Sequence, residues 1–199
     1  MTTTFFLVRH AAHDNLGAYL AGRMPGVRLG EAGLAQAGRL AKRMSAETFA
    51  KIVSSPRERA CETASAIAEG CLIDEVEVSH DLDEVDFGDW SGKSFDELNQ
   101  DPAWRRWNDE RGAAETPAGE TMEAVQRRMV GRMASLAAAF PDTALVLVSH
   151  ADVIRMAVCE VLGLSISQWP RFEVSPASIT TVVAGGWGSK LLGLNEVVH

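Results

Sequence analysis

The chain has 199 residues, of which 46% are apolar and 23% charged, and a formal net charge of −8. This length suits a single domain, while the acidic balance argues against nucleic acid or an anionic membrane as the main partner. No run approaches the ~20 apolar residues of a membrane span, and no signal-peptide pattern opens the chain. The three widely spaced cysteines form no Cys-x-x-Cys pair, so we expect neither a disulfide framework nor a zinc ribbon. Together these observations predict a cytoplasmic protein.

Strands and helices alternate along the first half of the chain. "TFFLV" predicts a buried strand that ends directly at Arg9 and His10. "KIVSS" predicts a second strand, followed by a helix from Pro56 to about residue 69, because proline suits the first turn of a helix. "VEVSH" predicts a third strand. Residues 31–47 have helical spacing, with an expected core face of Leu34, Ala37, Leu40, Ala41 and Met44.

The second half continues this alternation. Residues 81–94 are rich in Gly, Asp and Ser and predict a loop, and residues 94–111 predict one or two short helices. "TALVLVSH" is apolar without alternation, which is typical of a strand covered on both faces; a helix follows and ends near Gly163, and the tail predicts a hairpin or two edge strands. The longest helix candidate lies within 117–140, with an expected core face of Met122, Val125, Met129, Met133, Leu136 and Phe140.

This order of elements predicts an α/β fold, a three-layer α/β/α sandwich whose central sheet is mostly parallel with an antiparallel edge. We expect one domain over residues 1–199, with a helical insertion at about 92–118. Ligands of such sheets bind outside the carboxyl ends of the strands. The residues at the strand exits are therefore the candidates for function.

Four strand exits carry side chains suited to chemistry. They are Arg9 with His10, Arg57 with Arg59, the acidic residues Asp83, Glu84 and Asp86, and Ser149 with His150. A metal site is one candidate, since "HAAHD" offers His10, His13 and Asp14. Fixed positive charges beside it favour an anion instead, and arginine presents planar donors that match phosphate oxygens. A helix that starts after His150 would add backbone N–H groups, so the set predicts a phosphoryl-binding site.

Histidine is the expected nucleophile, because the chain contains no Gly-x-Ser-x-Gly and no P-loop motif. A neutral His10 would attack phosphorus, with its other ring nitrogen held by a hydrogen bond. Arg9, Arg59 and His150 would hold the phosphoryl oxygens. Glu84 is the expected proton donor, because neighbouring carboxylates raise one another's pKa.

Five segments together resemble the histidine phosphatase superfamily, the group that includes phosphoglycerate mutase and fructose-2,6-bisphosphatase. "LVRHA" resembles L-x-R-H-G, "SSPRERACETA" resembles S-S-P-x-x-R-A-x-x-T-A, "LDEVDFGDWSG" resembles L-x-E-x-x-F-G-x-W-E-G, "PAGETMEAVQRRM" resembles a P-x-G-E-S segment, and "VSHADVIR" resembles V-S-H-G-x-x-I-R. The resemblance spans nearly the whole chain. It implies a phosphohistidine on His10, a phosphate site of Arg9, Arg59, His150 and Ala151, the acid at Glu84, and neither a metal nor another cofactor.

The chain departs from the family pattern beside the phosphate site. Ala11 and Ala151 stand where the family has glycine, and Ala12, His13 and Leu16 replace its usual residues. These changes leave the substrate side of the site open.

Further substrate contacts are expected from polar residues near these motifs. Asn15 lies one position from the family's asparagine and is one candidate. Arg23, together with Arg28, could bind a second anionic group of the substrate. His13 and Asp14 either line the pocket mouth or belong to a solvated loop, whereas Arg57 is expected to be a surface charge.

The function that these observations favour is hydrolysis of a small phosphorylated substrate. The mutases of the family carry a longer insertion that this chain lacks, yet a mutase remains an alternative. A weakly active or non-catalytic phospho-ligand binder with a regulatory role is another. The tryptophans Trp104 and Trp107 either pack on the domain or form a lid, and a homodimer remains open.

Overall fold

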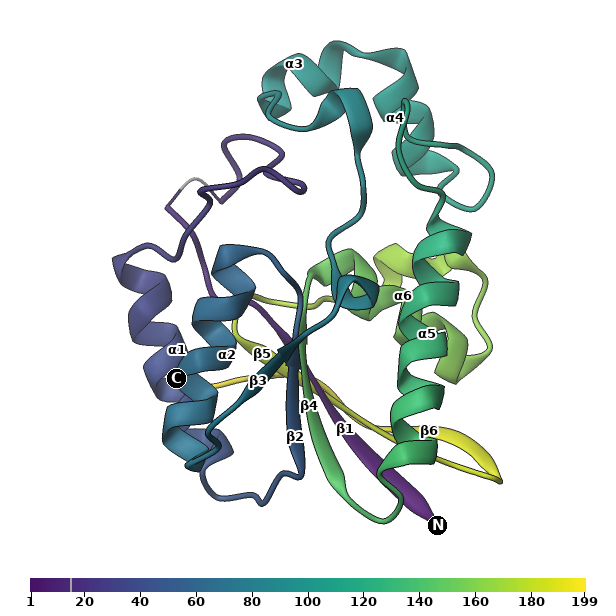
Figure 1. The fold of residues 1–199 in the computed structure, drawn as a ribbon. Helices are drawn as coiled ribbons and strands as arrows, with labels where there is room; N and C mark the ends of the chain where they lie inside the picture. The colour runs from purple at the N-terminus through teal and green to yellow at the C-terminus, as the bar shows by residue number, and fades with distance from the viewer. Residues whose placement is uncertain (15) are drawn as a thin grey trace.

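The computed structural model describes residues 1–14 and 16–199, which form an α/β fold around a six-stranded sheet (Figure 1). The strands are β1 (Thr2–Arg9), β2 (Lys51–Ser54), β3 (Val76–Val78), β4 (Ala144–Ser149), β5 (Ser178–Gly185) and β6 (Gly188–Val197). Their order across the sheet is β3-β2-β4-β1-β5-β6. The first four are parallel, whereas β5 runs antiparallel to β1 and β6 antiparallel to β5. The predicted fold class, with its antiparallel edge, is confirmed.

Helices cover both faces of this sheet. The α-helices of the fold are α1 (Glu31–Met44), α2 (Glu58–Cys71), α3 (Phe95–Gln100), α4 (Pro102–Asp109), α5 (Met122–Ala139) and α6 (Ala151–Leu162). The helices α1 and α2 cover one face and α5 and α6 the other, while α3 and α4 lie beyond the carboxyl ends of the parallel strands (Figure 1). No helix in the described ranges has the length and apolar character needed to cross a bilayer.

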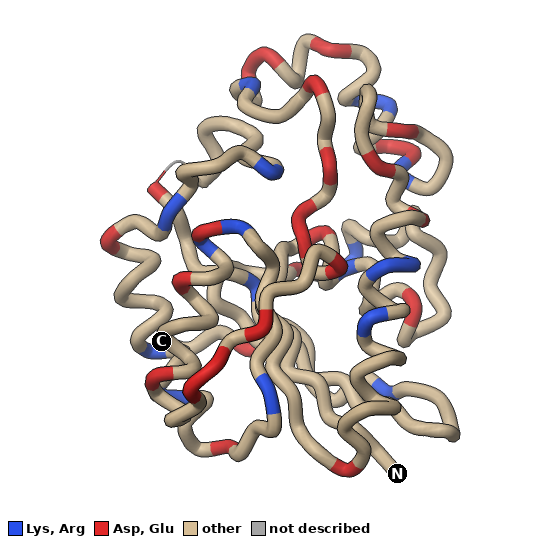
Figure 2. The backbone as a smooth tube through the Cα atoms, viewed as in Figure 1, with Lys and Arg blue, Asp and Glu red and all other residues tan. Residues whose placement is uncertain are grey.

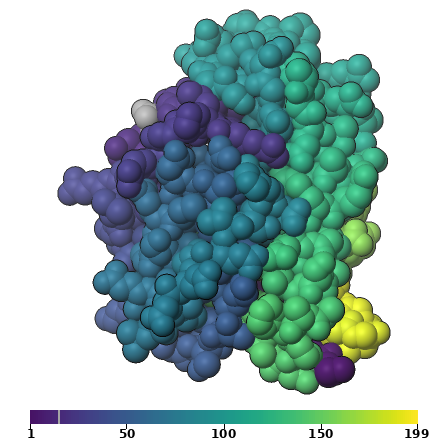
Figure 3. All heavy atoms as spheres, in the orientation of Figure 1, coloured from purple at the N-terminus to yellow at the C-terminus, as the bar shows by residue number. Residues whose placement is uncertain are grey.

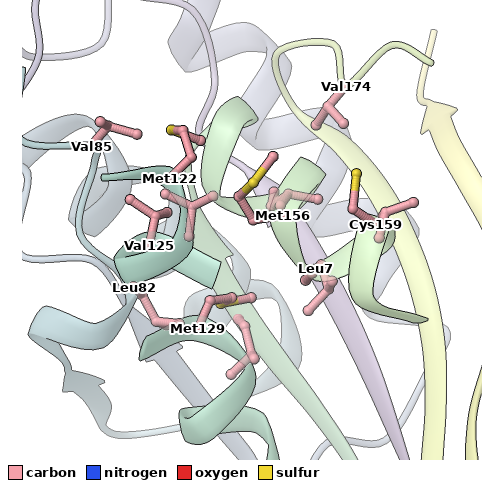
Figure 4. Packing of buried hydrophobic residues seen from close by; sticks show 14 of the residues in the cluster. Leu7, Leu82, Val85, Met122, Val125, Met129, Met156, Cys159 and Val174 are labelled. Carbon is pink, nitrogen blue, oxygen red and sulfur yellow. The ribbon is translucent and has the colours of Figure 1, made fainter. Parts of the chain in front are cut away.

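The central strand β1 is held by packing on both of its faces. Phe5 and Leu7 belong to the core cluster under α5 and α6, whereas Phe6 and Val8 belong to the cluster under α1 and α2. Successive side chains of a strand point to opposite faces, which explains the unbroken apolar run. Figure 4 shows Leu7 among side chains of α5 and α6. Burying each such side chain contributes roughly 1.5–3 kcal/mol, so the strand end that carries His10 has a rigid base.

The expected core face of α1 is wrong at its first position. Leu34 is 59% exposed, and Gly33 faces inward in its place. A Cβ atom on Gly33 would lie 1.8 Å from the Ala12 carbonyl oxygen, so only glycine lets α1 approach the segment that follows β1. Phe140, at the end of α5, is only partly buried against the core.

The segment that contains α3 and α4 is tied to the residues after β1. The Leu20 N–H donates to the Lys93 carbonyl at 2.9 Å, and the Gly92 N–H donates to the Leu20 carbonyl at 2.8 Å. Figure 3 shows the two segments in direct contact. Trp104 and Trp107 are buried and belong to the core cluster under α5 and α6. This tryptophan pair packs on the domain, which is one of its two expected roles, and it also lines the cavity below α3 and α4.

Candidate active site

The carboxyl ends of β1, β2 and β4 meet below α3 and α4 and enclose a cavity of about 330 Å³. The polar groups that line it include Arg9, His10, His13, Arg59, Glu84, Asn108, Arg111, Asp152 and Arg155, together with the backbone of Ala151. Residues from five distant parts of the sequence thus share one site, as expected for the strand exits of a parallel sheet.

His10 is buried at the end of β1, with 3% of its surface exposed. Its Nδ1 lies 2.8 Å from the Ala11 carbonyl oxygen, which fixes the proton on Nδ1 and leaves the lone pair on Nε2. Burial, followed by the charges of Arg59 and Arg9, holds the pKa of His10 well below its usual value. The imidazole is therefore neutral at pH values near 7, and its Nε2 can act as a nucleophile.

A buried arginine, Arg59, lies beside this imidazole, and a partly buried arginine, Arg9, precedes it in the chain. Arg59, in the first turn of α2, brings its Nε within 3.3 Å of His10 Nε2 and donates from Nη2 to the Gly22 carbonyl at 2.9 Å. Arg9 donates from Nη1 to the Val174 carbonyl at 2.7 Å. Arg59 Nη1 and Arg9 Nε are buried without a hydrogen-bond partner among the described residues. Buried donors are costly to leave unpaired, so these two N–H groups suit an oxyanion ligand.

The second histidine, His150, was also expected to bind phosphate; it lies beside His10 but is fully buried and does not itself line the cavity. It precedes α6 directly, and its ring centroid is 5.1 Å from that of His10. Its Nε2 lies 2.7 Å from Ser55 Oγ, and Arg59 Nη2 lies 3.3 Å from its Nδ1. An arginine only donates, so Nδ1 accepts and Nε2–H donates to the serine. The backbone N–H groups at the start of α6, from Ala151 onward, add the positive end of a helix dipole to the cavity.

Glu84 is the carboxylate of this site. Its Oε2 lies 3.4 Å from His150 Nδ1 and 3.8 Å from Arg59 Nη2. Burial is the main cause that raises the pKa of Glu84 to about 7, and the negative charge of Asp152 adds to the shift. A carboxyl group with this pKa carries a proton for much of the time at neutral pH and can donate it.

The sequence predicts that the neighbouring carboxylates Asp83 and Asp86 raise the pKa of Glu84, and this predicted cause is wrong. Asp83 is paired with Arg57, whose Nε lies 2.9 Å from Asp83 Oδ1, and Asp86 lies 3.4 Å from Arg23 Nη1. These two carboxylates are balanced by arginines and do not raise the pKa of Glu84. Arg57, expected on the surface, is instead largely buried in this ion pair.

Other expected contacts fall outside the cavity. Arg23 donates to the Glu84 carbonyl at 2.8 Å and lies 2.9 Å from Glu120 Oε2, and it does not line the cavity. Arg28 is exposed and paired with Glu62. Asn15 lies outside the described residues.

The donor set suits an anion rather than a cation. Within residues 1–14 and 16–199 no group of three or more His, Cys, Asp and Glu side chains is placed to hold a metal ion. Two arginines, a neutral imidazole, a helix N-terminus and a protonated carboxyl group are instead groups that can bind a phosphoryl group and stabilise the charge that develops during its transfer.

Comparison with known proteins assigns nearly the whole chain to one family. The family model of the histidine phosphatase superfamily, branch 1, matches residues 5–197. The chain belongs to this superfamily.

Curated relatives of this histidine phosphatase include both hydrolases and mutase-like proteins. Phosphoserine phosphatase 1 of Hydrogenobacter thermophilus is 30% identical over 97% of this chain and 92% of its own. The probable phosphoglycerate mutase GpmB of Proteus mirabilis is 30% identical, with 98% and 93% of the two chains covered. Among solved structures, Bacillus stearothermophilus YhfR matches with a TM-score of 0.92 at 27% identity, over 98% of both chains.

Several lining residues of this histidine phosphatase site were not singled out from the sequence. They are Tyr19, Arg111, Asp152, Arg155 and Trp169. For two of them the sequence contains a weak indication, namely their spacing from residues already named. Arg111 lies four residues after Trp107, and Asp152 lies two residues after His150 at the start of a helix.

Proposed function

We propose that this histidine phosphatase hydrolyses phosphomonoesters of small molecules through a phosphohistidine on His10. The observation that supports this most is the pairing of two groups in one cavity. The unprotonated Nε2 of the neutral His10 imidazole lies 3.3 Å from Arg59 Nε, and the carboxyl group of Glu84 has a raised pKa. A superfamily in which phosphohistidine chemistry is general supports the same reaction.

The first half of the reaction transfers the phosphoryl group to the protein. His10 Nε2 forms a bond to phosphorus while the bond from phosphorus to the alcohol oxygen breaks. Arg9, Arg59 and the N-terminus of α6 hold the three non-bridging oxygens and balance their charge. The proton of Glu84 goes to the departing oxygen, so that an alcohol leaves rather than an alkoxide.

The second half returns the protein to its starting state. The carboxylate of Glu84 accepts a proton from water, and the water oxygen attacks phosphorus. The bond between phosphorus and Nε2 breaks, inorganic phosphate leaves, and the neutral imidazole of His10 is restored. His150, held by Ser55, accepts from Arg59 Nη2 and so keeps that guanidinium in place in both steps.

The proposal includes independence from metal ions. The two arginines supply the positive charge that a divalent cation supplies at other phosphoryl-transfer sites. Turnover is therefore expected to persist in excess chelator, and loss that added metal restores would contradict this part of the proposal.

The proposal extends to the setting of the protein. We place it in the cytoplasm as one domain with an insertion at 92–118, acting on small phosphorylated molecules, with neither nucleic acid nor membrane as partner. The net charge of −8 supports this choice of partners. A homodimer is the oligomer we propose to test, by sedimentation velocity over a range of concentrations.

A mutase is the second candidate, because GpmB of Proteus mirabilis matches over nearly the whole chain. A mutase would keep the phosphoryl group on His10 until a second hydroxyl accepted it. Release of inorganic phosphate and interconversion of 3-phosphoglycerate and 2-phosphoglycerate, measured in the same sample, separate the two activities.

The direct test of hydrolysis uses p-nitrophenyl phosphate, whose leaving group needs no acid. His10→Ala is expected to abolish phosphate release, whereas His199→Ala, an exposed histidine far from the cavity lining, is expected to leave it unchanged. Full activity of the His10→Ala protein would refute the proposal.

A further inference from the structure

Beyond the phosphate-binding groups, the cavity is lined mainly by apolar and aromatic side chains. They are Leu16, Tyr19, Leu20, Phe87, Phe95, Trp104, Trp107 and Trp169. Leu16, Tyr19 and Leu20 come from the segment after β1, and most of the others come from the segment that it contacts, residues 87–107 (Figure 3). Tyr19, Phe95 and Trp169 are only partly buried, so their rings are open to a bound molecule.

The cations on this side of the cavity already have carboxylate partners. The Arg111 guanidinium lies between two indoles, with its Cζ 3.9 Å from the ring centroid of Trp107 and 3.5 Å from that of Trp169. Its Nη1 lies 2.8 Å from Asp152 Oδ1. Arg155 lies 3.1 Å from the same oxygen.

A second carboxylate, Glu173, lies 3.3 Å from Arg155 Nη2. Figure 2 shows how acidic residues recur on the segment between β3 and α3, and there Asp83 and Asp86 engage Arg23. Among the described lining residues, Arg9 has no carboxylate within 4 Å and Arg59 has only Glu84, at 3.8 Å, and phosphate takes both arginines. Arg111 and Arg155 each keep a buried Nε–H without a partner, but both share their charge with Asp152.

The remaining polar group near the phosphate site is neutral. His13 is 7% exposed, lines the cavity, and its ring centroid is 6.2 Å from that of His10. Burial, followed by the charge of Arg59, lowers the pKa of His13 to about 4, so it is uncharged near neutral pH. Its Nδ1 is buried without a partner among the described residues. Such a nitrogen can hydrogen-bond to a hydroxyl group but does not attract an anion.

We infer that this cavity selects phosphomonoesters of neutral, ring-bearing alcohols and disfavours substrates with a second anionic group. A ring gains from burial against aromatic faces, at about 25 cal/mol per Å² of apolar surface. A carboxylate would lose its water, and the guanidinium groups of Arg111 and Arg155 that could replace that water are already engaged by Asp152. At about 330 Å³ the cavity is at the small end of the range for ligand sites, roughly 300–1,000 Å³, which limits the alcohol to one or two rings.

This inference rests on the proposed function and narrows it. It also separates this chain from two of its relatives, a phosphoserine phosphatase and a probable phosphoglycerate mutase, whose names refer to phosphoesters that carry a carboxylate.

The test compares kcat/KM for alkyl phosphates whose leaving groups are equally poor. Benzyl phosphate and ribose 5-phosphate carry a neutral ring, glycerol 2-phosphate is neutral without a ring, and 3-phosphoglycerate and O-phosphoserine carry a carboxylate. We expect at least one ring ester to exceed glycerol 2-phosphate about 10-fold and the two carboxylate esters about 100-fold, from a desolvation cost of 1–3 kcal/mol for an unpaired polar group. A preference for benzyl phosphate would identify an aromatic alcohol, and one for ribose 5-phosphate a sugar.

The outcomes against the inference are distinct from those against the proposed function. Carboxylate esters that react as fast as the ring esters would overturn the inference and leave hydrolysis intact. Release of phosphate from none of these esters, nor from p-nitrophenyl phosphate, would overturn the proposed function and the inference with it.

Substitution of Asp152 tests the physical cause. Asp152→Asn removes the charge that pairs Arg111, so the kcat/KM ratio of 3-phosphoglycerate to benzyl phosphate is expected to rise about 10-fold. Any effect on Glu84 acts on both esters and cancels in the ratio. Arg111→Met added to Asp152→Asn is expected to remove the gain, and Glu69→Gln, at an exposed carboxylate outside the cavity lining, is the control with an unchanged ratio.

A second variant addresses the rings and does not depend on Asp152. Trp169→Ala is expected to lower kcat/KM for the preferred ring ester about 10-fold and to leave glycerol 2-phosphate within about 2-fold. If a folded Asp152→Asn protein keeps the original ratio, or if Trp169→Ala affects both neutral esters equally, the assigned basis of selection is wrong.

Discussion

Replacement of Glu84 by glutamine removes the proton and the charge of this side chain while keeping its size. For the transfer step, kcat/KM for an alkyl ester is expected to fall about 100- to 10,000-fold, the usual contribution of a general acid. For p-nitrophenyl phosphate, whose anion leaves without a proton, the loss in kcat/KM is expected to stay below about 10-fold. Because kcat/KM reports the steps up to formation of the phosphohistidine, slower hydrolysis of that intermediate does not obscure the comparison.

The same substitution has a predicted effect on stability. Burial raises the pKa of Glu84 to about 7 from its ordinary value of 4.5. The folded protein therefore holds this proton more tightly than the unfolded chain does, and stability is lost as pH rises from the unfolded to the folded pKa. From this shift, ionisation of Glu84 costs about 3 kcal/mol near pH 8 and less than about 1 kcal/mol near pH 5.

Glutamine does not ionise, so Glu84→Gln is expected to stabilise the fold more at the higher pH. The difference in unfolding free energy between variant and wild type should grow by about 2–3 kcal/mol between about pH 5 and pH 8, as measured by urea denaturation at each pH. A pH-independent difference would show that Glu84 does not have a raised pKa. Equal losses of kcat/KM for alkyl and aryl esters would remove Glu84 from the role of acid.

Three further predictions concern the phosphate site and its supports. Arg59→Lys is expected to raise the inhibition constant of inorganic phosphate about 10- to 150-fold, because a hydrogen bond to a charged group contributes about 1.5–3 kcal/mol. Arg57→Lys, away from the cavity lining, should leave this constant nearly unchanged. Similar inhibition constants for both variants would contradict the assigned phosphate site. In wild type, kcat/KM for benzyl phosphate should decline above the pKa of Glu84, about 7, while kcat/KM for p-nitrophenyl phosphate should decline less, and parallel profiles would argue against the assigned acid. Gly33→Ala should lower both thermal stability and turnover because its Cβ would meet the Ala12 carbonyl. Gly38→Ala, which has open space on the same helix, should instead stabilise the folded protein by about 0.5–1 kcal/mol. A tolerated Gly33→Ala would show that α1 does not constrain the loop after β1.

The sheet and its helices could be predicted from the sequence because their signals are local. The apolar run before His10 and the one before His150 each predict a strand covered on both faces, and the structure places core clusters on both sides of each strand. The parallel order then brings His10, Arg59 and His150 to one edge, which is why spacing along the chain carried information about the site.

The leaving-group side of the site could not be predicted in this way. Arg111, Asp152 and Trp169 meet only because α4 folds over the carboxyl ends of the strands, and no local pattern records such a contact. Leu34 shows the same limit, since its helical spacing is right, yet the close approach of α1 to Ala12 gives the inward position to Gly33. For Glu84 the predicted cause of the raised pKa is wrong, because the shift comes from burial, and burial depends on packing that adjacent acidic residues do not reveal.

The central claim is that phosphorus becomes bonded to His10 during turnover. Rapid acid-free denaturation of the protein in the presence of a ³²P-labelled ester, followed by peptide mapping, tests it directly. We predict a label that is stable in alkali, labile in acid and confined to the peptide that contains His10, and absent from the His10→Ala protein. An acid-stable label, or one carried by a different residue, would contradict the account.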